Sequence, residues 1–216
     1  MDRDGAVAAG LRPADGEIEA DAVVKGGGIV GITTALLLAE AGADVVLLEA
    51  ERVGHGVSGH TTAKVSSQHG MIYTTLRSRF GDDGARTYAQ ANEAALAWIA
   101  ERVRGDAIDC DFRRRASYAY VTDPSRRREA EDEASAAIAA GLPATLVESA
   151  PLPFTTGAAV RFGEQAEFHV AKYLRALVDA LRRAGGRIHE HSCAVELDEG
   201  GGPVVRRRAA ACAPIA

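Results

Sequence analysis

Apolar runs and helical apolar stripes alternate along this chain, a pattern typical of a mixed α/β protein. Short apolar runs occupy residues 22–24 and 45–48, the second of them within an expected strand over residues 44–49. The stretch between them, residues 29–41, has the apolar spacing of a helix and is followed by Gly42. A strand, a helix and a second strand in this order are typical of a parallel βαβ unit. We therefore expect an α/β fold whose ordered part begins near Asp21.

The rest of the chain predicts three more helices and three more strands. Each helix has apolar side chains at i, i+3 and i+4 spacing, and a glycine follows it as a C-terminal cap. The strands are short runs rich in alternating or β-branched apolar residues. We expect helices over residues 83–104, 124–140 and 169–184, strands over residues 117–121, 158–162 and 187–197, and loops over residues 52–60 and 151–154.

Three glycines mark the turn between the first strand and the first helix. Gly26, Gly28 and Gly31 have the G-x-G-x-x-G spacing of a dinucleotide-binding turn. Glycine permits a tight turn, lets backbone N–H groups approach a pyrophosphate, and lets the helix pack closely on the strand. Glu49, at the end of the second apolar run, has the position of the acid that binds a ribose diol. The pattern predicts a bound dinucleotide with a free 2′-hydroxyl, but it does not separate NAD from FAD.

A long insertion separates two expected parts of the dinucleotide-binding domain. A simple NAD-dependent dehydrogenase would continue directly to a third strand after Glu49, so the insertion favours a flavin cofactor. We expect a Rossmann-like fold with a long α+β insertion. The expected divisions are a mobile lead-in over residues 1–20, the Rossmann-like domain over residues 21–60 and 185–198, the helical, substrate-side insertion over residues 61–184, and an irregular tail over residues 199–216.

One residue departs from the pattern of the first strand. Lys25 precedes the first glycine on a strand that the fold is expected to bury on both faces. Burial of an ammonium without a carboxylate partner costs on the order of several kcal/mol. We interpret Lys25 as a damaging or tolerated change in preference to a lysine that reaches the pyrophosphate.

The composition argues against several classes of function. The formal net charge is −5 and no basic stripe with interleaved aromatic residues occurs, so a nucleic-acid partner is not expected. The N-terminal residues lack the basic and apolar segments of a secretory signal, and no apolar run is long enough to cross a membrane. Three cysteines, none in a Cys-x-x-Cys pair, fit reduced thiols in a cytoplasmic protein.

No metal site is expected from the sequence. His191 and Cys193 are close together, but further ligands are lacking. The chain has no Cys-x-His or Cys-x-x-His pair to hold a Rieske cluster, so we do not expect that cofactor in this chain.

Several segments carry a resemblance to a known family. They are residues 26–34, residues 48–50, the loop with Arg52, Gly54, Gly56 and Ser58, residues 59–70, residues 109–112 and residues 165–169. Through them the chain, from about Ile18 to about Leu197, resembles the D-amino-acid-oxidase-like superfamily of FAD-dependent oxidoreductases. Its Rieske-domain-bearing and gamma-glutamylputrescine-oxidase-like members are the most similar. The resemblance implies a Rossmann-like fold of the glutathione-reductase-like type and FAD as the cofactor. Because the family continues beyond Leu197 with further strands, it also implies that this chain is the N-terminal part of the enzyme and that the fold is incomplete at the C-terminus.

The resemblance also implies where FAD binds. Gly26, Gly28 and Gly31 would hold the pyrophosphate, and Ile29 and Val30 lie between the last two glycines in the same cofactor-binding turn. The other residues so assigned are Glu49 at the adenosine ribose, Arg52 near the adenosine and phosphates, Thr61, Thr62 and Ala63 on the flavin side, and Ala194, whose backbone faces the adenine edge.

The resemblance assigns no catalytic residue. In this superfamily the flavin itself takes the hydride from a C–N bond, so a protein base is not required. We interpret His69 and His169 as structural residues that hydrogen-bond a turn or a helix start. Two interpretations of Lys64 stay open: a cation that stabilises the anionic reduced flavin, and a lysine that binds a phosphate or forms a structural ion pair.

Three functions follow in order of preference. The first is FAD-dependent oxidation of the CH–NH group of a small amine or amino acid, with hydride transfer to flavin, by an enzyme of which this chain is an N-terminal fragment. The second is a non-catalytic nucleotide-binding or interaction fragment. The third is an NAD-dependent dehydrogenase, which the insertion and residues 59–70 disfavour.

Overall fold

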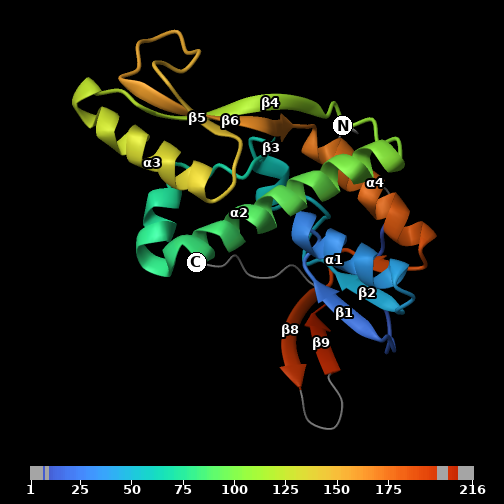
Figure 1. Cartoon of the computed structure of the whole chain (residues 1–216). Helices are drawn as coiled ribbons and strands as arrows, with labels where there is room; N and C mark the ends of the chain where they lie inside the picture. Colours follow the sequence, from blue (N-terminus) through green and yellow to red (C-terminus); the bar gives the residue numbers. More distant parts are fainter. Residues whose placement is uncertain (1–6, 8–9, 199–203, 209–216) are drawn as a thin grey trace. The chain divides into compact units, whose positions relative to one another are not determined.

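The computed structural model describes residue 7, residues 10–198 and residues 204–208. The chain divides into two compact units, and Figure 1 labels their α-helices and most of their strands. The first unit combines Met1–Thr62 with His169–Ala216, and the second unit is the continuous stretch Ala63–Phe168. The second unit is therefore an insertion within the first.

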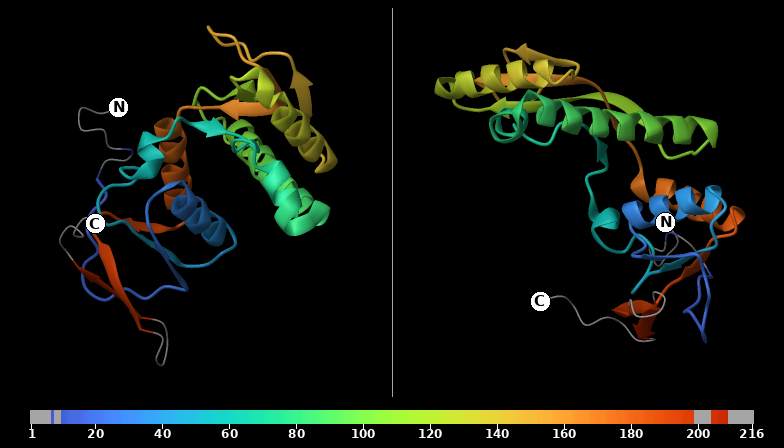
Figure 2. Two further views of the ribbon diagram at one scale, coloured as in Figure 1. Left: turned by 90° about the vertical axis from the view of Figure 1, so that its left-hand side faces the viewer. Right: turned by 60° about the horizontal axis from the view of Figure 1, so that its bottom comes forward.

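The first unit is built on a three-stranded parallel sheet. Its strands lie in the order β1 (Ala22–Lys25), β2 (Val45–Leu48) and β7 (Arg187–His189). All residues of β2 are buried, as expected for a parallel strand covered on both faces. Helices α1 (Ile29–Glu40) and α4 (Val170–Arg183) pack against each other on one side of this sheet (Figure 2). The predicted α/β fold with a parallel βαβ unit is confirmed.

The first unit also contains an antiparallel hairpin of β8 (Cys193–Asp198) and β9 (Val204–Arg208). The prediction of an irregular tail is therefore wrong for residues 204–208. The rest of the predicted tail, residues 199–203 and 209–216, lies outside the described residues.

Two kinds of contact explain why β9 forms. Val205 packs against a small apolar core that includes Val46 and Leu48 of β2. Arg206 is paired with Glu196 across the hairpin, with 3.4 Å between Nε and Oε2. Apolar packing on one face and a cross-strand charge pair both stabilise a hairpin, and neither contact is visible in the short run Val-Val-Arg-Arg-Arg.

Part of the expected lead-in packs on the first unit. Residues 10–20 form no helix or strand, but Ala14 is buried, and its N–H donates to Ser192 Oγ over 2.9 Å. This packed stretch differs from the expected mobile lead-in, because Ala14 joins the same small core as β2. Residues 1–6 and 8–9 lie outside the described residues.

The second unit contains a four-stranded antiparallel sheet. Its long strand β6 (Ala158–Glu167) pairs with β3 (Lys64–Val65), β4 (Arg113–Val121) and β5 (Ala144–Val147). One face of the sheet carries the apolar residues of the core, which also takes in small side chains from the helices. The core residues include Ala119, Val121, Ala130, Ala134, Ala137, Val160 and Phe162.

Helices α2 (Tyr73–Gly105) and α3 (Arg127–Ala139) pack on each other, and α3 also packs on β4, β5 and β6. Because the buried face of α3 consists mainly of alanine, the helix and the sheet approach closely. Two short 3-10 helices complete the described elements, η1 (Val57–His60) in the first unit and η2 (Pro124–Arg126) immediately before α3.

Some element ends differ from the predictions. Strands β3 and β5 have no counterpart among the predicted strands, because runs of two and four residues carry little periodic signal. Helix α2 begins at Tyr73 and is broken at Gly81, whose φ is +73°. The predicted strand over residues 187–197 is two strands, because the chain turns between them at His191, which has a φ of +49°.

The second unit is shorter than the predicted insertion over residues 61–184. It ends at Phe168, and α4 belongs to the first unit. The reason is that α4 packs on α1, with Tyr173, Leu177 and Leu181 among its fully buried residues.

Lys25 is exposed in the structure, so the expectation that it is buried is wrong. Within the residues that the structure describes, β1 pairs with β2 alone, and its positions alternate between half-buried and exposed. The ammonium of Lys25 therefore reaches solvent and does not carry the desolvation cost of a buried charge.

The structure also describes two of the cysteines and the character of the helices. Of the described cysteines, Cys110 is buried, whereas Cys193 is disulfide-bonded, which corrects the expectation of reduced thiols. Among the described residues, we find no helix with the length and apolar character that crossing a membrane requires.

Candidate dinucleotide-binding site

The turn between β1 and α1 has the geometry that the glycine pattern predicts. Gly26 has a φ of +101°, a left-handed conformation that favours glycine, and its N–H donates to the carbonyl of Leu48 over 2.8 Å. A Cβ atom on Gly31 would lie only 1.9 Å from the carbonyl oxygen of Gly26. Glycine at position 31 therefore lets the first turn of α1 approach the end of β1.

The glycine-rich loop after β2 packs on this turn. The N–H of Gly54 donates to the carbonyl of Gly27 over 3.0 Å. At the start of α1, the N–H of Ile29 donates to Ser58 Oγ over 3.0 Å. A Cβ atom on Gly59 would lie 2.2 Å from the carbonyl oxygen of Gly54, so the loop is closely folded. These contacts place a hydroxyl at a helix N-terminus, where the partial positive charge favours an anion.

Glu49 lies next to the same turn. Its Oε2 accepts a hydrogen bond from the N–H of Gly27 over 2.5 Å, and its Oε1 accepts one from the N–H of Glu51 over 2.8 Å. The side chain is half-buried and follows directly after β2. An acid held at the end of the second strand, beside the glycine turn, is the arrangement that recognises the ribose of a dinucleotide.

The chain after β7 holds the backbone around Glu49. The N–H of Ser192 donates to the carbonyl of Glu49 over 2.8 Å. The N–H of Val53 donates to Oε1 of Glu190 over 2.8 Å, and Glu190 is buried. Residues that are far apart in sequence therefore fix the backbone on both sides of the acid.

Three contributors to this site are absent from the predicted site residues. Ser58 appears in the sequence only as part of a loop, although a hydroxyl in a glycine-rich loop after the second strand is a signal for a contact with the helix N-terminus. Glu190 and Ser192 carry no local signal, because their partners are reached only through the parallel pairing of β7 with β2.

The other predicted residues are spread over both units. Arg52 is exposed in the loop after β2, and Thr61 and Thr62 are exposed after η1. Ala63 has a φ of +57° and begins the second unit, to which Lys64 also belongs. Val30 is exposed in the first turn of α1, and Ala194 is half-buried on β8. Their contacts with a cofactor stay predictions, and so do both interpretations of Lys64.

The two histidines named in the sequence have hydrogen-bond partners. His169 is the N-cap residue of α4, and its Nδ1 lies 3.5 Å from the N–H of Lys172. This confirms the prediction of a histidine at a helix start. Nδ1 of His69 lies 2.9 Å from the hydroxyl of Tyr88, and the two rings meet edge to face. Within the described ranges, no group of three or more His, Cys, Asp or Glu side chains has the arrangement of a metal site.

Comparison with known proteins agrees with this geometry. A family model described as DAO, FAD dependent oxidoreductase, matches residues 21–213. YhfW of Bacillus subtilis (strain 168), named as a Rieske 2Fe-2S iron-sulfur protein, is 37% identical over 189 residues, which is 88% of this chain and 37% of YhfW. Gamma-glutamylputrescine oxidoreductase of Escherichia coli (strain K12) is 36% identical over 106 residues, which is 49% of this chain and 25% of that enzyme.

Solved structures share the fold. The L-amino acid deaminase of Proteus myxofaciens, in complex with anthranilate, superposes with a TM-score of 0.67 at 19% sequence identity. The match covers 91% of this chain and 45% of the deaminase. The chain thus spans less than half the length of each of these relatives.

The family match includes β1, the glycine turn, α1, Glu49 and the loop that carries Ser58. These are the parts whose geometry fits a dinucleotide, and the resemblance seen in the sequence is confirmed. The chain therefore belongs to the DAO family of FAD-dependent oxidoreductases.

Proposed function

We propose that this chain holds FAD in an oxidoreductase that oxidises the CH–NH group of a small amine or amino acid. The observation that carries the proposal is the carboxylate of Glu49 beside a glycine turn that opens onto the N-terminus of α1. The printed names of the relatives support the substrate class, since one is a gamma-glutamylputrescine oxidoreductase and another an L-amino acid deaminase. A cytoplasmic location is part of the same proposal.

The residues at the turn fit the diphosphate and ribose of FAD. Backbone N–H groups of Val30 and Gly31 at the start of α1 would bind the pyrophosphate, and Ile29, whose own N–H donates to Ser58 Oγ, would line the same turn. A Cβ at Gly31 would clash with the carbonyl oxygen of Gly26 and displace these groups. Glu49 would accept hydrogen bonds from the ribose diol. When bound, FAD supplies the hydride acceptor for cleavage of the substrate C–H bond.

We also propose contacts between FAD and the other residues that the sequence predicts to bind it. Arg52 would lie near the adenosine and phosphates and Ala194 near the adenine edge. Thr61, Thr62, Ala63 and Lys64 would lie on the flavin side. The positive φ of Ala63 supports a special role for this segment, because a strained backbone is retained where the surroundings require it.

Substitution of Glu49 tests the ribose contact. Because hydrogen bonds to a carboxylate contribute roughly 1.5–3 kcal/mol each, Glu49→Ala is expected to weaken FAD binding by about 10- to 100-fold. Glu49→Gln, which keeps one acceptor oxygen, is expected to lose less. Titration of FAD followed by flavin fluorescence measures the affinity, and far-UV circular dichroism checks the fold.

The exposed Glu17 provides a matched control in the same unit. Glu17→Gln also removes one negative charge, and we expect it to leave FAD affinity within about twofold of wild type, since the exposed side chain makes none of the hydrogen bonds described at the glycine turn. Equal losses in the Glu17 and Glu49 variants would mean that net charge, and not the ribose contact, controls binding.

The function itself is tested with purified protein. FAD is added, the unbound cofactor is removed, and the visible flavin band is recorded before and after anaerobic addition of amines and amino acids. We expect a yellow protein whose flavin band bleaches with at least one substrate. A folded protein that retains no FAD, or that binds NADH in its place, would contradict the proposal. A yellow protein that no amine bleaches would favour a non-catalytic nucleotide-binding role.

A further inference from the structure

Gln165 lies on β6 and does not belong to the predicted cofactor-binding residues. The β4–β6 ladder shifts register at this point, because two residues of β6, Gly163 and Glu164, stand opposite the single Ala116 of β4. Glu164 has a φ of +55°, in the left-handed region. A bulge of this kind redirects the side chains that follow it, and the next residue is Gln165.

The side-chain amide of Gln165 is buried and fully hydrogen-bonded. Its Oε1 accepts from the N–H of Ser67 over 2.6 Å and from Ser67 Oγ over 3.1 Å. Its Nε2 donates to the carbonyl of Gly163 over 2.8 Å and lies 3.3 Å from Oε1 of Glu93. These partners use both lone pairs of the amide oxygen and both N–H groups of the amide nitrogen. A carboxylate at this position could not donate the two hydrogen bonds.

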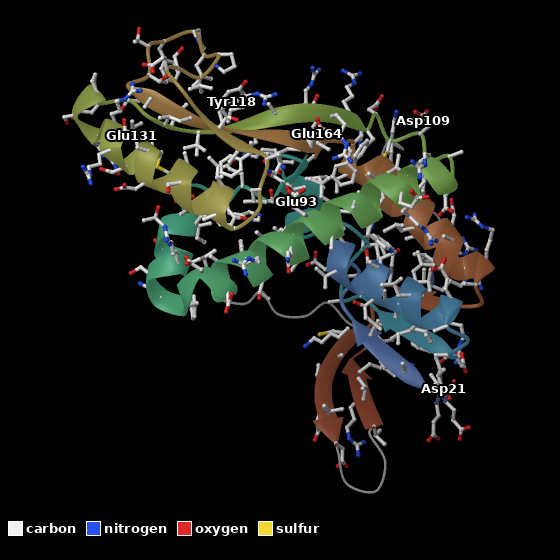
Figure 3. All side chains as sticks on the ribbon, viewed as in Figure 1. Asp21, Glu93, Asp109, Tyr118, Glu131 and Glu164 are labelled. Carbon is white, nitrogen blue, oxygen red and sulfur yellow. The ribbon has the colours of Figure 1, made fainter. Side chains whose placement is uncertain are left out.

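Glu93 comes from α2, on the side of the helix that lies toward β3 and β6 (Figure 3). The buried amide therefore connects three segments of the second unit: the bulge of β6, helix α2, and the segment after β3. Within the described part of the chain, Gln165 and Ser67 are among the few polar residues that are fully buried.

The segment after β3 depends on side chains for its position. Strand β3 pairs with β6 at only two residues, Lys64 and Val65, and the ladder is not continued at Ser67. The N–H of Ser67 instead donates to the Gln165 side chain. A side chain thus supplies the hydrogen bond that a longer strand would have made through its backbone.

A second side chain holds the backbone carbonyl of Ser67. The hydroxyl of Tyr73 donates to the carbonyl of Ser67 over 2.7 Å. Burial, together with the nearby Tyr88, Glu93 and Glu133, raises the pKa of Tyr73, so its hydroxyl stays protonated and remains a donor. Both backbone polar groups of Ser67 are thereby fixed by buried side chains.

We propose that Gln165 is a positioning residue for Ala63 and Lys64, the part of the flavin-side segment that belongs to the second unit, which it holds through Ser67. This inference rests on the proposed function, because the contact of that segment with flavin is part of it. Gln165 does not touch the cofactor in this account. It fixes the backbone conformation that carries Ala63 and Lys64, and misplacement of a positioning segment by about 1 Å is enough to impair an active site about a hundredfold.

Two near-isosteric substitutions test the proposal. Gln165→Glu places a carboxylate oxygen against the carbonyl of Gly163 and the carboxylate of Glu93, and Gln165→Met removes the hydrogen bonds without adding charge. In both variants we expect hydrogen–deuterium exchange of residues 64–70 to accelerate about tenfold or more. We also expect FAD affinity to fall about tenfold and the visible circular dichroism of bound flavin to change.

Thr156 provides the matched control. It is buried in the second unit, where its Oγ1 accepts from the N–H of Ala150 over 3.0 Å. Thr156→Val is expected to lower the stability of this unit while leaving exchange of residues 64–70, FAD affinity and the flavin spectrum unchanged. The comparison separates loss of stability from loss of positioning.

The proposal is overturned if a folded Gln165 variant keeps wild-type exchange at residues 64–70, or if it binds FAD with wild-type affinity and spectrum. Unfolding of the second unit by both variants would also overturn it, because Gln165 would then determine the fold rather than position a segment. If the wild-type chain binds no FAD, the proposed function fails, and the exchange measurement alone decides whether Gln165 holds the segment.

Discussion

Replacement of Gly31 by alanine is expected to abolish FAD binding and to lower the free energy of unfolding of the first unit by roughly 3 kcal/mol. The new Cβ would lie 1.9 Å from the carbonyl oxygen of Gly26 and 3.0 Å from its carbonyl carbon. Both are backbone atoms, so no change of rotamer relieves the clash. Relief requires α1 to move away from β1, and this movement displaces the N–H groups that would bind the pyrophosphate.

Unfolding in urea is monitored by hydrogen–deuterium exchange, which gives the free energy of unfolding of each unit separately. A separate titration with FAD measures the affinity for the cofactor. Gly105→Ala is the control, because a Cβ at this last residue of α2 meets nothing within 4 Å. We expect that variant to change stability by about 0.5 kcal/mol or less. A Gly31→Ala protein with wild-type stability and FAD affinity would refute the close packing of helix on strand.

Replacement of Glu133 by alanine is expected to destabilise the second unit by about 3–5 kcal/mol. Glu133 is fully buried on α3, and it accepts from the N–H groups of Tyr73 and Thr74, each over 2.9 Å. It also accepts from Thr74 Oγ1 over 2.8 Å. Helix α2 has no side-chain cap at its own N-cap residue, Ile72, so the carboxylate of Glu133 satisfies its first N–H groups.

The same urea titration measures the effect, here as the free energy of unfolding of the second unit. Glu131→Ala, on the same helix, removes an exposed ion pair with Arg127 and is expected to cost less than about 1 kcal/mol. Glu133→Gln should fall between the two, because the amide retains one acceptor oxygen. If Glu133→Ala were no more harmful than Glu131→Ala, the carboxylate would not be the cap of α2.

Local sequence patterns predict the dinucleotide-binding half of the fold. The apolar run of β2, the glycine spacing and the stripe of α4 each reflect contacts between neighbours in the chain or a repeating burial pattern. Glu49 could be predicted for the same reason, since its position relative to the turn is set by one helix and one strand. The structure confirms these elements because the packing agrees with the local preferences.

The features that the sequence does not predict depend on distant partners. Glu133 caps a helix that begins 60 residues earlier in the chain, and Gln165 replaces a strand hydrogen bond of Ser67. Neither side chain belongs to a periodic pattern. Lys25 shows the opposite error, because the expectation of burial assumes that both faces of the first strand are covered, whereas β1, at the edge of the described sheet, alternates between half-buried and exposed residues.

The insertion also affects the order in which the protein can fold during synthesis on the ribosome. The N–H of Phe168 donates to the carbonyl of Ala63 over 3.3 Å, so the two ends of the inserted unit adjoin. All its residues emerge from the exit tunnel before α4 and β7, and it can fold as soon as they do. The parallel sheet of the first unit, by contrast, gains the third of its described strands only after β7 has emerged.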